Sequence, residues 1–480
     1  VALKRPALRT YEGGPAVRTP ALEELTRAVS TCLLFERTFY EGGDSIAGRI
    51  ATLCDQVSLE DIGALAVLAR HELKLRHVPL WLALQAVRIN SARKLGSDIP
   101  SQILFHVIQR PDELSETLAL YWKEGKRPLA KQLKRGLALA FTKFSVYQLA
   151  KWNRDADIRL RDVLFTCHAC PEDGYSAKRK PTFPIQRKDY HRGQTWRHQE
   201  GQGKLWQQLI DGTLPVPETW EVALSAGKDK KSIWEKLLRE NKLGIIATLM
   251  NCRNFVYAGV DRSLIRRYLL DKAHGSWALP FRFISAAKHA PSLAADLSEA
   301  MLLAIQGRGS LEGQTLIVVD VSGSMDRPIA AKSTLTRLEA AAALAVLARE
   351  VCAEARVFTF STELVEVDNY RGLPLVRVIA ESQGHGGTYL GQALKALSGV
   401  CPHADRLLVI TDEQSHDGNK RPWGNAGQQE RAYILNVAAD RPALSLAGGW
   451  KRVNGFSERL LDWISYEENG RVAGAEDEAE

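Results

Sequence analysis

The sequence contains no long hydrophobic run. Its longest apolar stretch, residues 340–348, is far shorter than the roughly 20 residues that span a bilayer. The opening segment VALKRPALRTYEGG lacks the apolar core of a secretory signal, so we expect neither a signal peptide nor a membrane segment. Cysteines are also few: the chain has seven, an odd number, and most lie far apart. This usage argues against a disulfide framework and predicts a reducing, cytoplasmic location.

Charge is divided unevenly along the chain. The net charge is +8 overall, but residues 311–480 hold 17 Lys and Arg against 24 Asp and Glu, a net −7. Residues 1–310 hold 47 against 32, a net +15. A basic excess can serve solubility alone, but its confinement to one part of the chain favours a polyanion as partner of that part.

The part before residue 310 has the pattern of helices. Apolar residues recur at three- and four-residue spacing, most clearly over residues 58–72, 78–92, 110–125, 127–144, 232–252 and 290–306. Strand signals are scarce there. We predict that residues 1–310 form an all-α array of HEAT-like repeats.

After residue 310 the pattern changes to α/β. Short β-rich runs at 315–322, 355–361, 406–413 and 433–438 alternate with helical segments at 338–355, 375–382, 388–399 and 457–464. This alternation predicts a doubly wound, Rossmann-like sheet over residues 311–480. Ligands of such sheets gather at the carboxyl ends of the strands, where the strand order switches.

Oxygen-bearing side chains lie at these predicted strand ends, in VVDVSGSM, GHGGTYLG and VITDEQ. The set comprises Asp320, Ser322, Ser324, Thr388 and Asp412. Hydroxyls with only two carboxylates suit one hard cation such as Mg²⁺, which takes about six oxygens. The simpler interpretation is that the two serines cap the following helix. We predict a divalent-cation site, where nearby His385 and Glu413 could change the metal preference.

Cations in the helical part form candidate RNA contacts. On a helix, RPLAKQLKRG would place four of them on one stripe: Arg127, Lys131, Lys134 and Arg135. A solvated helix face produces such stripes too. Further along, LAKWNRDADIRLRDVLFTCHA adds Lys151, Arg154 and His168. A neutral histidine can donate to phosphate or stack on a base, although a lone histidine is commonly structural.

Two further patterns overlap this region. Residues 178–206 interleave cations with Phe183, Tyr190, Trp196 and Trp206, the mixture that single-stranded nucleic acid needs, although a mobile solvated loop is an equal interpretation. The spacing in CHAC also permits zinc, with a candidate set of Cys167, Cys170, His191 and His198. We favour ordinary reduced thiols over zinc, because the spacing of the histidines exceeds that of zinc fingers.

The chain resembles the Ro autoantigen family, which joins a TROVE domain to a von Willebrand factor A domain. The stretches that carry the resemblance, in family order, are RPLAKQLKRGLALAF, LAKWNRDADIRLRDVLFTCHACP, VVDVSGSM, GGTYLGQAL, VITDE and NGFSERLLDWI. The pattern D-x-S-x-S, then T, then D, is similar to the metal-ion-dependent adhesion site of A domains. His168 matches a histidine implicated in Y RNA contact, whereas Cys170 stands where the family usually has lysine.

This resemblance implies a ring of helical repeats clasped by the A domain. It implies that small structured Y RNAs bind the outer surface of the ring, and that single-stranded 3′ ends of misfolded or immature RNAs enter its hole. Bacterial members act with exoribonucleases such as polynucleotide phosphorylase, so the resemblance implies a factor in RNA quality control or maturation. We expect a monomeric protein that binds RNA and is not an enzyme.

Two other functions stay open. In a Mg²⁺-dependent ribonuclease the cation would act as a Lewis acid, but the set lacks the spaced carboxylates of two-metal nucleases. Residues 321–323, Val-Ser-Gly, also lack the first glycine of a G-x-S-x-G nucleophile turn. A protein-adhesion scaffold would bind a partner's carboxylate through the cation and would bind RNA only non-specifically.

Overall fold

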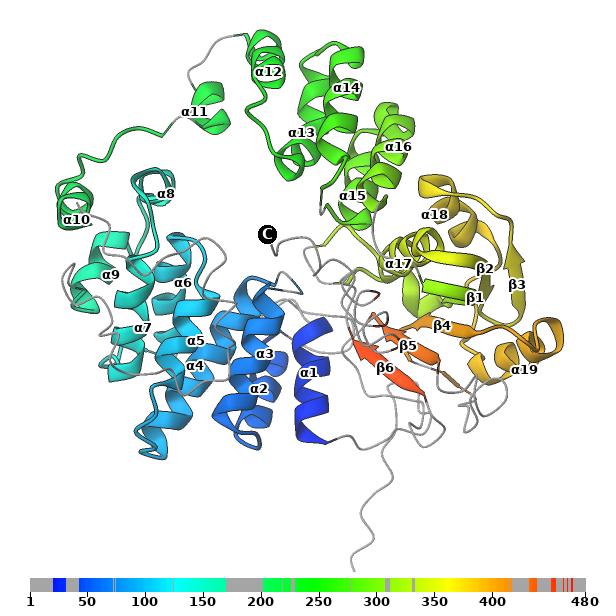
Figure 1. Cartoon of the computed structure of the whole chain (residues 1–480), viewed down its shortest axis with the longest axis horizontal. Coiled ribbons are helices and arrows are strands. Elements are labelled where there is room, and N and C mark those ends of the chain that lie inside the picture. The colour runs from blue at the N-terminus through cyan, green and yellow to red at the C-terminus, as the bar shows by residue number, and fades with distance from the viewer. Residues whose placement is uncertain are drawn as a thin grey trace, which may run out of the picture. The chain divides into compact units, whose positions relative to one another are not determined.

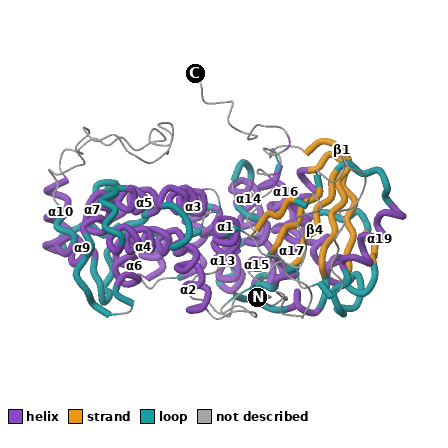
Figure 2. Tube along the Cα trace, turned by 90° about the horizontal axis from the view of Figure 1, so that it is seen from below, coloured by secondary structure: helices purple, strands orange, loops and turns teal. Residues whose placement is uncertain are grey.

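The computed structural model describes residues 20–31, 43–71, 73, 75–123, 125–169, 202–217, 219–225, 229–276, 278–306, 311–329, 333–413, 415–416, 431–437, 450–454, 461, 464 and 468. Every strand in this part of the chain begins at or after residue 311, and helices come before it (Figures 1 and 2). The predicted fold class, a helical part followed by an α/β part, is confirmed. None of the described helices is both long and apolar enough to cross a membrane.

The helices that precede the sheet are short. They are α1 (Ala21–Thr31), α2 (Gly43–Cys54), α3 (Leu59–His71), α4 (His77–Ala92), α5 (Ile99–Val107), α6 (Asp112–Tyr121), α7 (Lys131–Phe141), α8 (Val146–Trp152), α9 (Leu160–Thr166), α10 (Gln202–Asp211), α11 (Trp220–Ser225), α12 (Lys230–Arg239), α13 (Ile245–Tyr257), α14 (Arg262–Ala273), α15 (Pro280–His289) and, after the 3₁₀ turn η2 (Pro291–Leu293), α16 (Ala294–Ile305).

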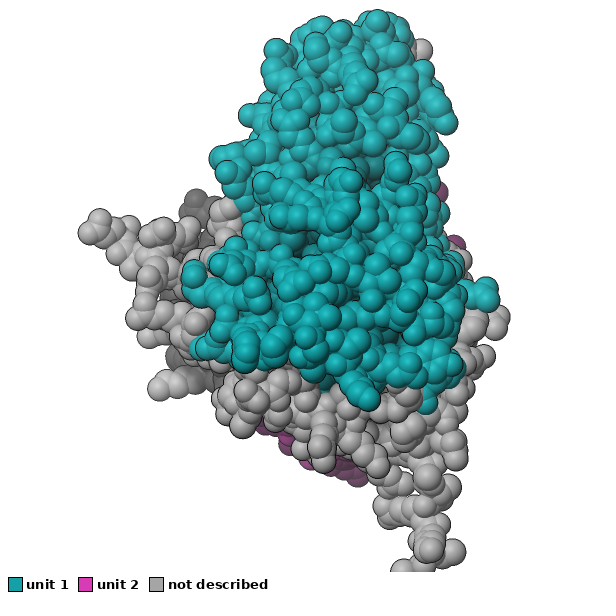
Figure 3. Space-filling model, turned by 90° about the vertical axis from the view of Figure 1, so that its right-hand side faces the viewer, with its two compact units in different colours: residues 1–19, 30–46, 223–480 teal, residues 20–29, 47–222 magenta. Residues whose placement is uncertain are grey.

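The chain forms two compact units (Figure 3). Unit 2 comprises residues 20–29 and 47–222, and unit 1 comprises residues 1–19, 30–46 and 223–480. Helices α12 to α16 therefore belong to the same unit as the sheet, although the change from helix to strand occurs after Ile305.

Unit 2 is built around α3, α4, α5 and α7, which pack on one another. Gly136 lets α7 approach α5 closely, since a Cβ at this position would lie 2.6 Å from a methyl carbon of Leu104. The helix predicted over residues 127–144 is shorter than expected. It begins at Lys131, because Ala130 before it has extended backbone.

In unit 1, the single helix predicted over residues 232–252 is two helices, α12 and α13. The chain turns between them at Asn241, which has a φ of +58°. The backbone N–H of Leu243 donates to the hydroxyl of Tyr268 on α14, which holds the turn from outside. A long-range contact therefore interrupts a stretch whose local pattern favours one continuous helix.

The sheet of unit 1 has the strand order β3-β2-β1-β4-β5-β6. Its strands are β1 (Leu311–Asp320), β2 (Cys352–Phe360), β3 (Leu364–Val367), β4 (Arg406–Thr411), β5 (Ala432–Asn436) and β6 (Lys451–Asn454). All neighbours are parallel except β2 and β3. The strand order reverses between β1 and β4, which makes this the point where a doubly wound sheet binds ligands.

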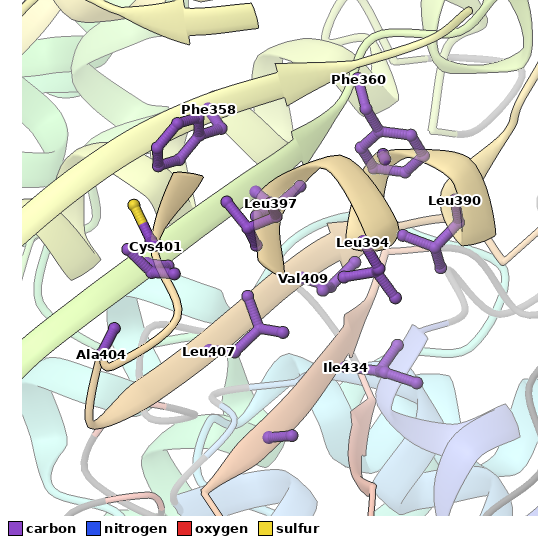
Figure 4. Close-up of a cluster of buried hydrophobic side chains, with 14 of the residues drawn as sticks. Phe358, Phe360, Leu390, Leu394, Leu397, Cys401, Ala404, Leu407, Val409 and Ile434 are labelled. Atoms are coloured by element: carbon purple, nitrogen blue, oxygen red, sulfur yellow. The ribbon is translucent and has the colours of Figure 1, made fainter. Parts of the chain in front are cut away.

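Helices cover the sheet and join it to α15 and α16. Apolar residues of β1, β2, β4 and β5 pack against α19 (Leu390–Val400), as Figure 4 shows for Phe358, Leu394 and Val409. The alanine-rich α17 (Arg337–Val351) begins with a capping box between Thr336 and Glu339. It ends at Val351 and not at the predicted residue 355, because β2 starts at Cys352. Helix α17 packs on α15, and α16 packs on α18 (Gly372–Glu381).

Candidate functional site

The predicted cation site lies at the reversal of the strand order. Asp320 is the last residue of β1, and Asp412 directly follows β4, the parallel neighbour of β1. Both carboxylates are fully buried. Burial, and then the negative charge of Asp412, raise the pKa of Asp320 to about 7. Two buried carboxylates that destabilise each other in this way favour a cation between them.

Hydrogen bonds fix three of the predicted ligands. The backbone N–H of Ser322 donates to Asp320 Oδ1 at 2.9 Å, and the hydroxyl of Thr411 donates to Asp320 Oδ2 at 2.6 Å. The hydroxyls of Ser322 and Ser324 lie 3.3 Å apart. These serines precede and enter a short 3₁₀ turn, Gly323–Asp326, but neither side chain caps it or α17, whose cap is Thr336. Helix capping therefore does not explain the two serines.

Asp412 has a cationic partner that the sequence analysis missed. Arg337, in the first turn of α17, is fully buried, and its Nη1 donates to Asp412 Oδ2 at 3.0 Å. The same nitrogen donates to the carbonyl oxygen of Ser324 at 3.4 Å. Arg337 thus ties the Ser324 turn to Asp412 and balances one of the two negative charges.

Thr388 lies in a loop that is fastened to the serine turn. The backbone N–H of Gly323 donates to the carbonyl of Gly386 at 3.1 Å. Thr388 is buried, and its carbonyl oxygen accepts from the N–H of His416 at 2.9 Å. Hydrogen bonds thus connect the loop that carries Thr388 to the serine turn and to the residues that follow β4.

His385 and Glu413, which were expected to influence the metal preference, have other partners. Nδ1 of His385 lies 2.8 Å from both oxygens of Asp326, and its Nε2 lies 2.9 Å from the carbonyl of Ala380. Both ring nitrogens of His385 are thus engaged by Asp326 and by the carbonyl of Ala380. Glu413 Oε1 accepts from Asn436 at the end of β5.

This donor set fits a hard cation. It offers two carboxylates and three hydroxyls at one end of the sheet, and oxygen ligands of this kind suit Mg²⁺. Within the described residues no three His, Cys, Asp or Glu side chains form a metal-binding group, and the hydroxyls add oxygen donors to the two carboxylates. The residues that would hold the cation are those predicted from the sequence, and Arg337 positions one of them.

The predicted basic stripe is only partly on one helix. Lys131, Lys134 and Arg135 lie on α7, opposite its buried face. Arg127 lies before the helix, and its guanidinium turns back to the ring and the carbonyl of Tyr121. Arg127 therefore does not extend the stripe, because the helix starts four residues later than the spacing predicted.

Cations surround Trp152 at the end of α8. The guanidinium carbons of Arg110 and Arg154 lie 3.8 and 4.9 Å from the centre of the indole ring, and Lys151 Nζ lies 5.8 Å from it. Trp152 is partly exposed, and Arg154 is exposed. We call these four residues the Trp152 cluster. Lys151 and Arg154 were predicted, but Trp152 and Arg110 were not, and only the tryptophan within LAKWNR gave a local signal.

His168 follows α9 as an exposed residue with a φ of +55°, a left-handed conformation that histidine adopts more readily than most side chains. The neighbouring Phe165 is also exposed. Cys167 is buried, and burial raises the pKa of its thiol to about 11, although Lys134 lies close enough to oppose the shift. The stripe on α7 and the end of α9 are therefore neighbours.

Several predicted features lie outside the described residues. They are Cys170, Phe183, Tyr190, His191, Trp196 and His198, which include three of the four candidate zinc ligands. Trp206, the last aromatic residue of the predicted insertion, lies on α10 and is buried against Phe141 of α7. It therefore has a structural role and presents no face to a base.

Comparisons with known proteins agree with the motifs. The TROVE domain family matches residues 205–342, from α10 into α17. The crystal structure of Deinococcus radiodurans RO (RSR) protein has a similar fold, with 16% sequence identity and a TM-score of 0.57, over 94% of this chain and 100% of that chain. The resemblance to the Ro autoantigen family that the motifs predicted is thus confirmed.

Proposed function

We propose, from this resemblance and from the cationic surfaces of unit 2, that the chain is an RNA-binding component of a ribonucleoprotein. The observation that carries the proposal is the Trp152 cluster. Three cations and an accessible indole lie within one site there. Cations bind the phosphates of RNA, and aromatic faces stack on unpaired bases, so the cluster offers both contacts.

The finer assignment follows the resemblance. We infer that a structured RNA of the Y type binds unit 2 through the α7 stripe, His168 and the Trp152 cluster. Single-stranded 3′ ends of misfolded or precursor RNAs are the second ligand, bound in the hole of a helical ring. Bound RNA is then kept from, or passed to, an exoribonuclease such as polynucleotide phosphorylase in the cytoplasm.

The cation site has a separate role in this proposal. When bound there, Mg²⁺ supplies an electrophilic position for a carboxylate of a protein partner. Asp320, Ser322, Ser324, Thr388 and Asp412 would hold the ion. The fully engaged ring of His385 supports binding over catalysis, because the site then lacks a free general base from this histidine. RNA incubated with the protein and Mg²⁺ is therefore expected to stay intact, and its degradation would favour the ribonuclease alternative.

The α7 stripe is tested by reversing charges on its exposed side. The double variant Lys131→Glu and Lys134→Glu is expected to bind a Y-like stem-loop at least about tenfold more weakly, with a salt slope lower by about two, because each lysine neutralises one phosphate. The measurement is fluorescence anisotropy over a salt series. The buried face of α7 is unchanged, so the variant should fold.

The matched control makes the same charge change on α12. Lys230→Glu with Lys236→Glu replaces two exposed lysines of that helix. It is expected to alter the affinity for the stem-loop far less than the α7 variant. Equal losses in the two double variants would mean that net charge alone, and not the α7 stripe, determines RNA binding.

A further inference from the structure

Arg337 connects two elements of the candidate cation site. Its Nη1 donates to Asp412 Oδ2 at 3.0 Å and to the carbonyl oxygen of Ser324 at 3.4 Å. The side chain of Arg337 is 2% exposed and that of Asp412 is 0% exposed, so bulk water screens neither charge. Both groups that Arg337 contacts belong to segments that carry candidate ligands. Its positive charge is therefore part of the site.

The first turn of α17 holds Arg337 in place from two sides. The backbone N–H of Arg337 donates to the carbonyl of Arg327 at 2.9 Å. The preceding residue, Thr336, forms the capping box with Glu339. On the other side, Nζ of Lys288 on α15 donates to Glu339 Oε1 at 2.9 Å. The guanidinium of Arg337 is therefore a fixed charge, which is present whether or not a cation is bound.

The charge of Arg337 changes what the site attracts. Asp320 and Asp412 supply two negative charges, and Arg337 cancels one of them. A divalent cation would leave these three groups with one net positive charge, whereas without the arginine it would only neutralise the two carboxylates. The buried carboxylate of Glu413 contributes equally in both cases. With Arg337 present, the occupied site is thus one unit more positive and attracts an anion more strongly.

We propose that Arg337 makes the binding of the cation and the binding of an acidic protein partner depend on each other. It lowers the affinity for the cation alone, because it repels a second positive charge, and a partner's carboxylate restores that affinity. The carboxylate would approach at Ser324, which is partly exposed whereas the other four candidate ligands are buried. The inference rests on the proposed cation site and adds the residue that sets its affinity and its preference for a partner.

The test measures Mg²⁺ binding to the full chain by calorimetry. Arg337→Gln removes the charge but keeps a donor for Asp412, and is expected to bind Mg²⁺ at least about tenfold more tightly than the wild type. Arg337→Lys keeps the charge and is expected to stay within about threefold. If Arg337 only positioned Asp412, Arg337→Gln would instead bind Mg²⁺ more weakly than the wild type.

The matched control removes a buried arginine at the other end of the same strand. Arg406 is the first residue of β4, is fully buried and donates from Nε to Glu468 Oε1 at 2.8 Å. Arg406→Gln makes the same substitution far from the candidate ligands, and is expected to keep the Mg²⁺ affinity within about twofold of the wild type. An equal gain in Arg406→Gln and Arg337→Gln would mean that net charge alone, and not the position of Arg337, sets the affinity.

A second measurement needs no variant and decides the question if Arg337→Gln does not fold. Mg²⁺ affinity is compared in sodium acetate and in sodium chloride, at matched ionic strength and free Mg²⁺. Acetate is expected to raise the affinity of the wild type at least about threefold, and that of Arg337→Gln by less.

The outcomes separate this inference from the proposed function. Equal wild-type affinities in the two salts would overturn the coupling, as would a loss of Mg²⁺ affinity, or no change, in Arg337→Gln. In those cases the wild type still binds Mg²⁺, so the cation site stands and only the role of Arg337 is wrong. If the wild type binds no Mg²⁺ in either salt, the cation site itself fails and the inference fails with it.

Discussion

Asp320→Asn is expected to weaken Mg²⁺ binding by at least about 100-fold and to leave RNA affinity unchanged. Losing a hydrogen-bond partner of a metal ligand already costs about 10–100-fold in metal affinity, and Asp320 would contact the ion itself. The substitution keeps the side-chain shape, so the N–H of Ser322 retains an oxygen acceptor. RNA binding should not respond, because the proposed RNA contacts use none of the residues at the ends of β1 and β4.

The stability of the same variant gives a second readout. Without metal, the Asp320 carboxylate is buried and is repelled by Asp412, whereas Arg337 is paired with Asp412. The variant without metal should therefore be at least as stable as the wild type at neutral pH. Excess Mg²⁺ at about 100 times the dissociation constant should stabilise the wild type by about 2.7 kcal/mol and the variant by far less.

Glu354→Ala is the control for this experiment. Glu354 is an exposed carboxylate in the first half of β2, at the other end of the sheet from Asp320. The Glu354→Ala variant is expected to keep the metal affinity and the stability of the wild type, as measured by calorimetry and thermal unfolding. If Asp320→Asn still responds to Mg²⁺ as the wild type does, the predicted site holds no cation.

Glu113→Ala is expected to lower the free energy of unfolding by about 3–5 kcal/mol, because breaking a buried ion pair leaves an uncompensated charge. Glu113 is fully buried, and its oxygens accept from Arg70 Nη2 at 2.7 and 2.9 Å. They also accept from the backbone N–H groups of Gln109 and Arg110. Without Glu113, the nearly buried guanidinium of Arg70 would lose its carboxylate partner. The segment that places Arg110 against Trp152 would also be held less firmly.

The control for this variant is an ion pair on a helix surface. Glu381→Ala removes the partner of Arg377 on α18, where the two side chains are 64% and 77% exposed, and is expected to cost about 0.5 kcal/mol. Chemical denaturation of the full chain measures both variants. A loss below about 1 kcal/mol for Glu113→Ala would mean that the buried network does not hold unit 2 together. RNA binding is compared under conditions where both variants are folded.

The position of the candidate cation ligands at strand ends was predictable because their signals are local. An aspartate at the end of an apolar strand, followed by alternating serines, identifies a strand end without knowledge of the fold. Arg337 gave no such signal, since its contact with Asp412 joins residues 75 positions apart. Its buried position depends on how α17 packs against β1 and β4, which helical periodicity does not specify.

The helical part was predictable in type but less so in its boundaries. Apolar periodicity predicted α3 and α4 closely. It extended α6 past Tyr121 to residue 125, extended α7 back over Pro128 and joined α12 to α13. The last error arose because the hydroxyl of Tyr268, 25 residues away, stabilises the turn. The Trp152 cluster was found only in part for a similar reason: Arg110 reaches the indole from the connection between α5 and α6, and sequence spacing does not reveal that contact.

The most direct test of RNA binding by this chain uses a hairpin with a single-stranded 3′ tail and the same hairpin with a blunt end. Affinities are measured over a salt series, with and without EDTA. We expect tight, tail-dependent binding with a steep salt slope and no effect of EDTA, because RNA and the cation use different sites. Equally weak, micromolar binding of both hairpins at physiological salt would contradict the proposed function, since this is the affinity of non-specific contacts alone.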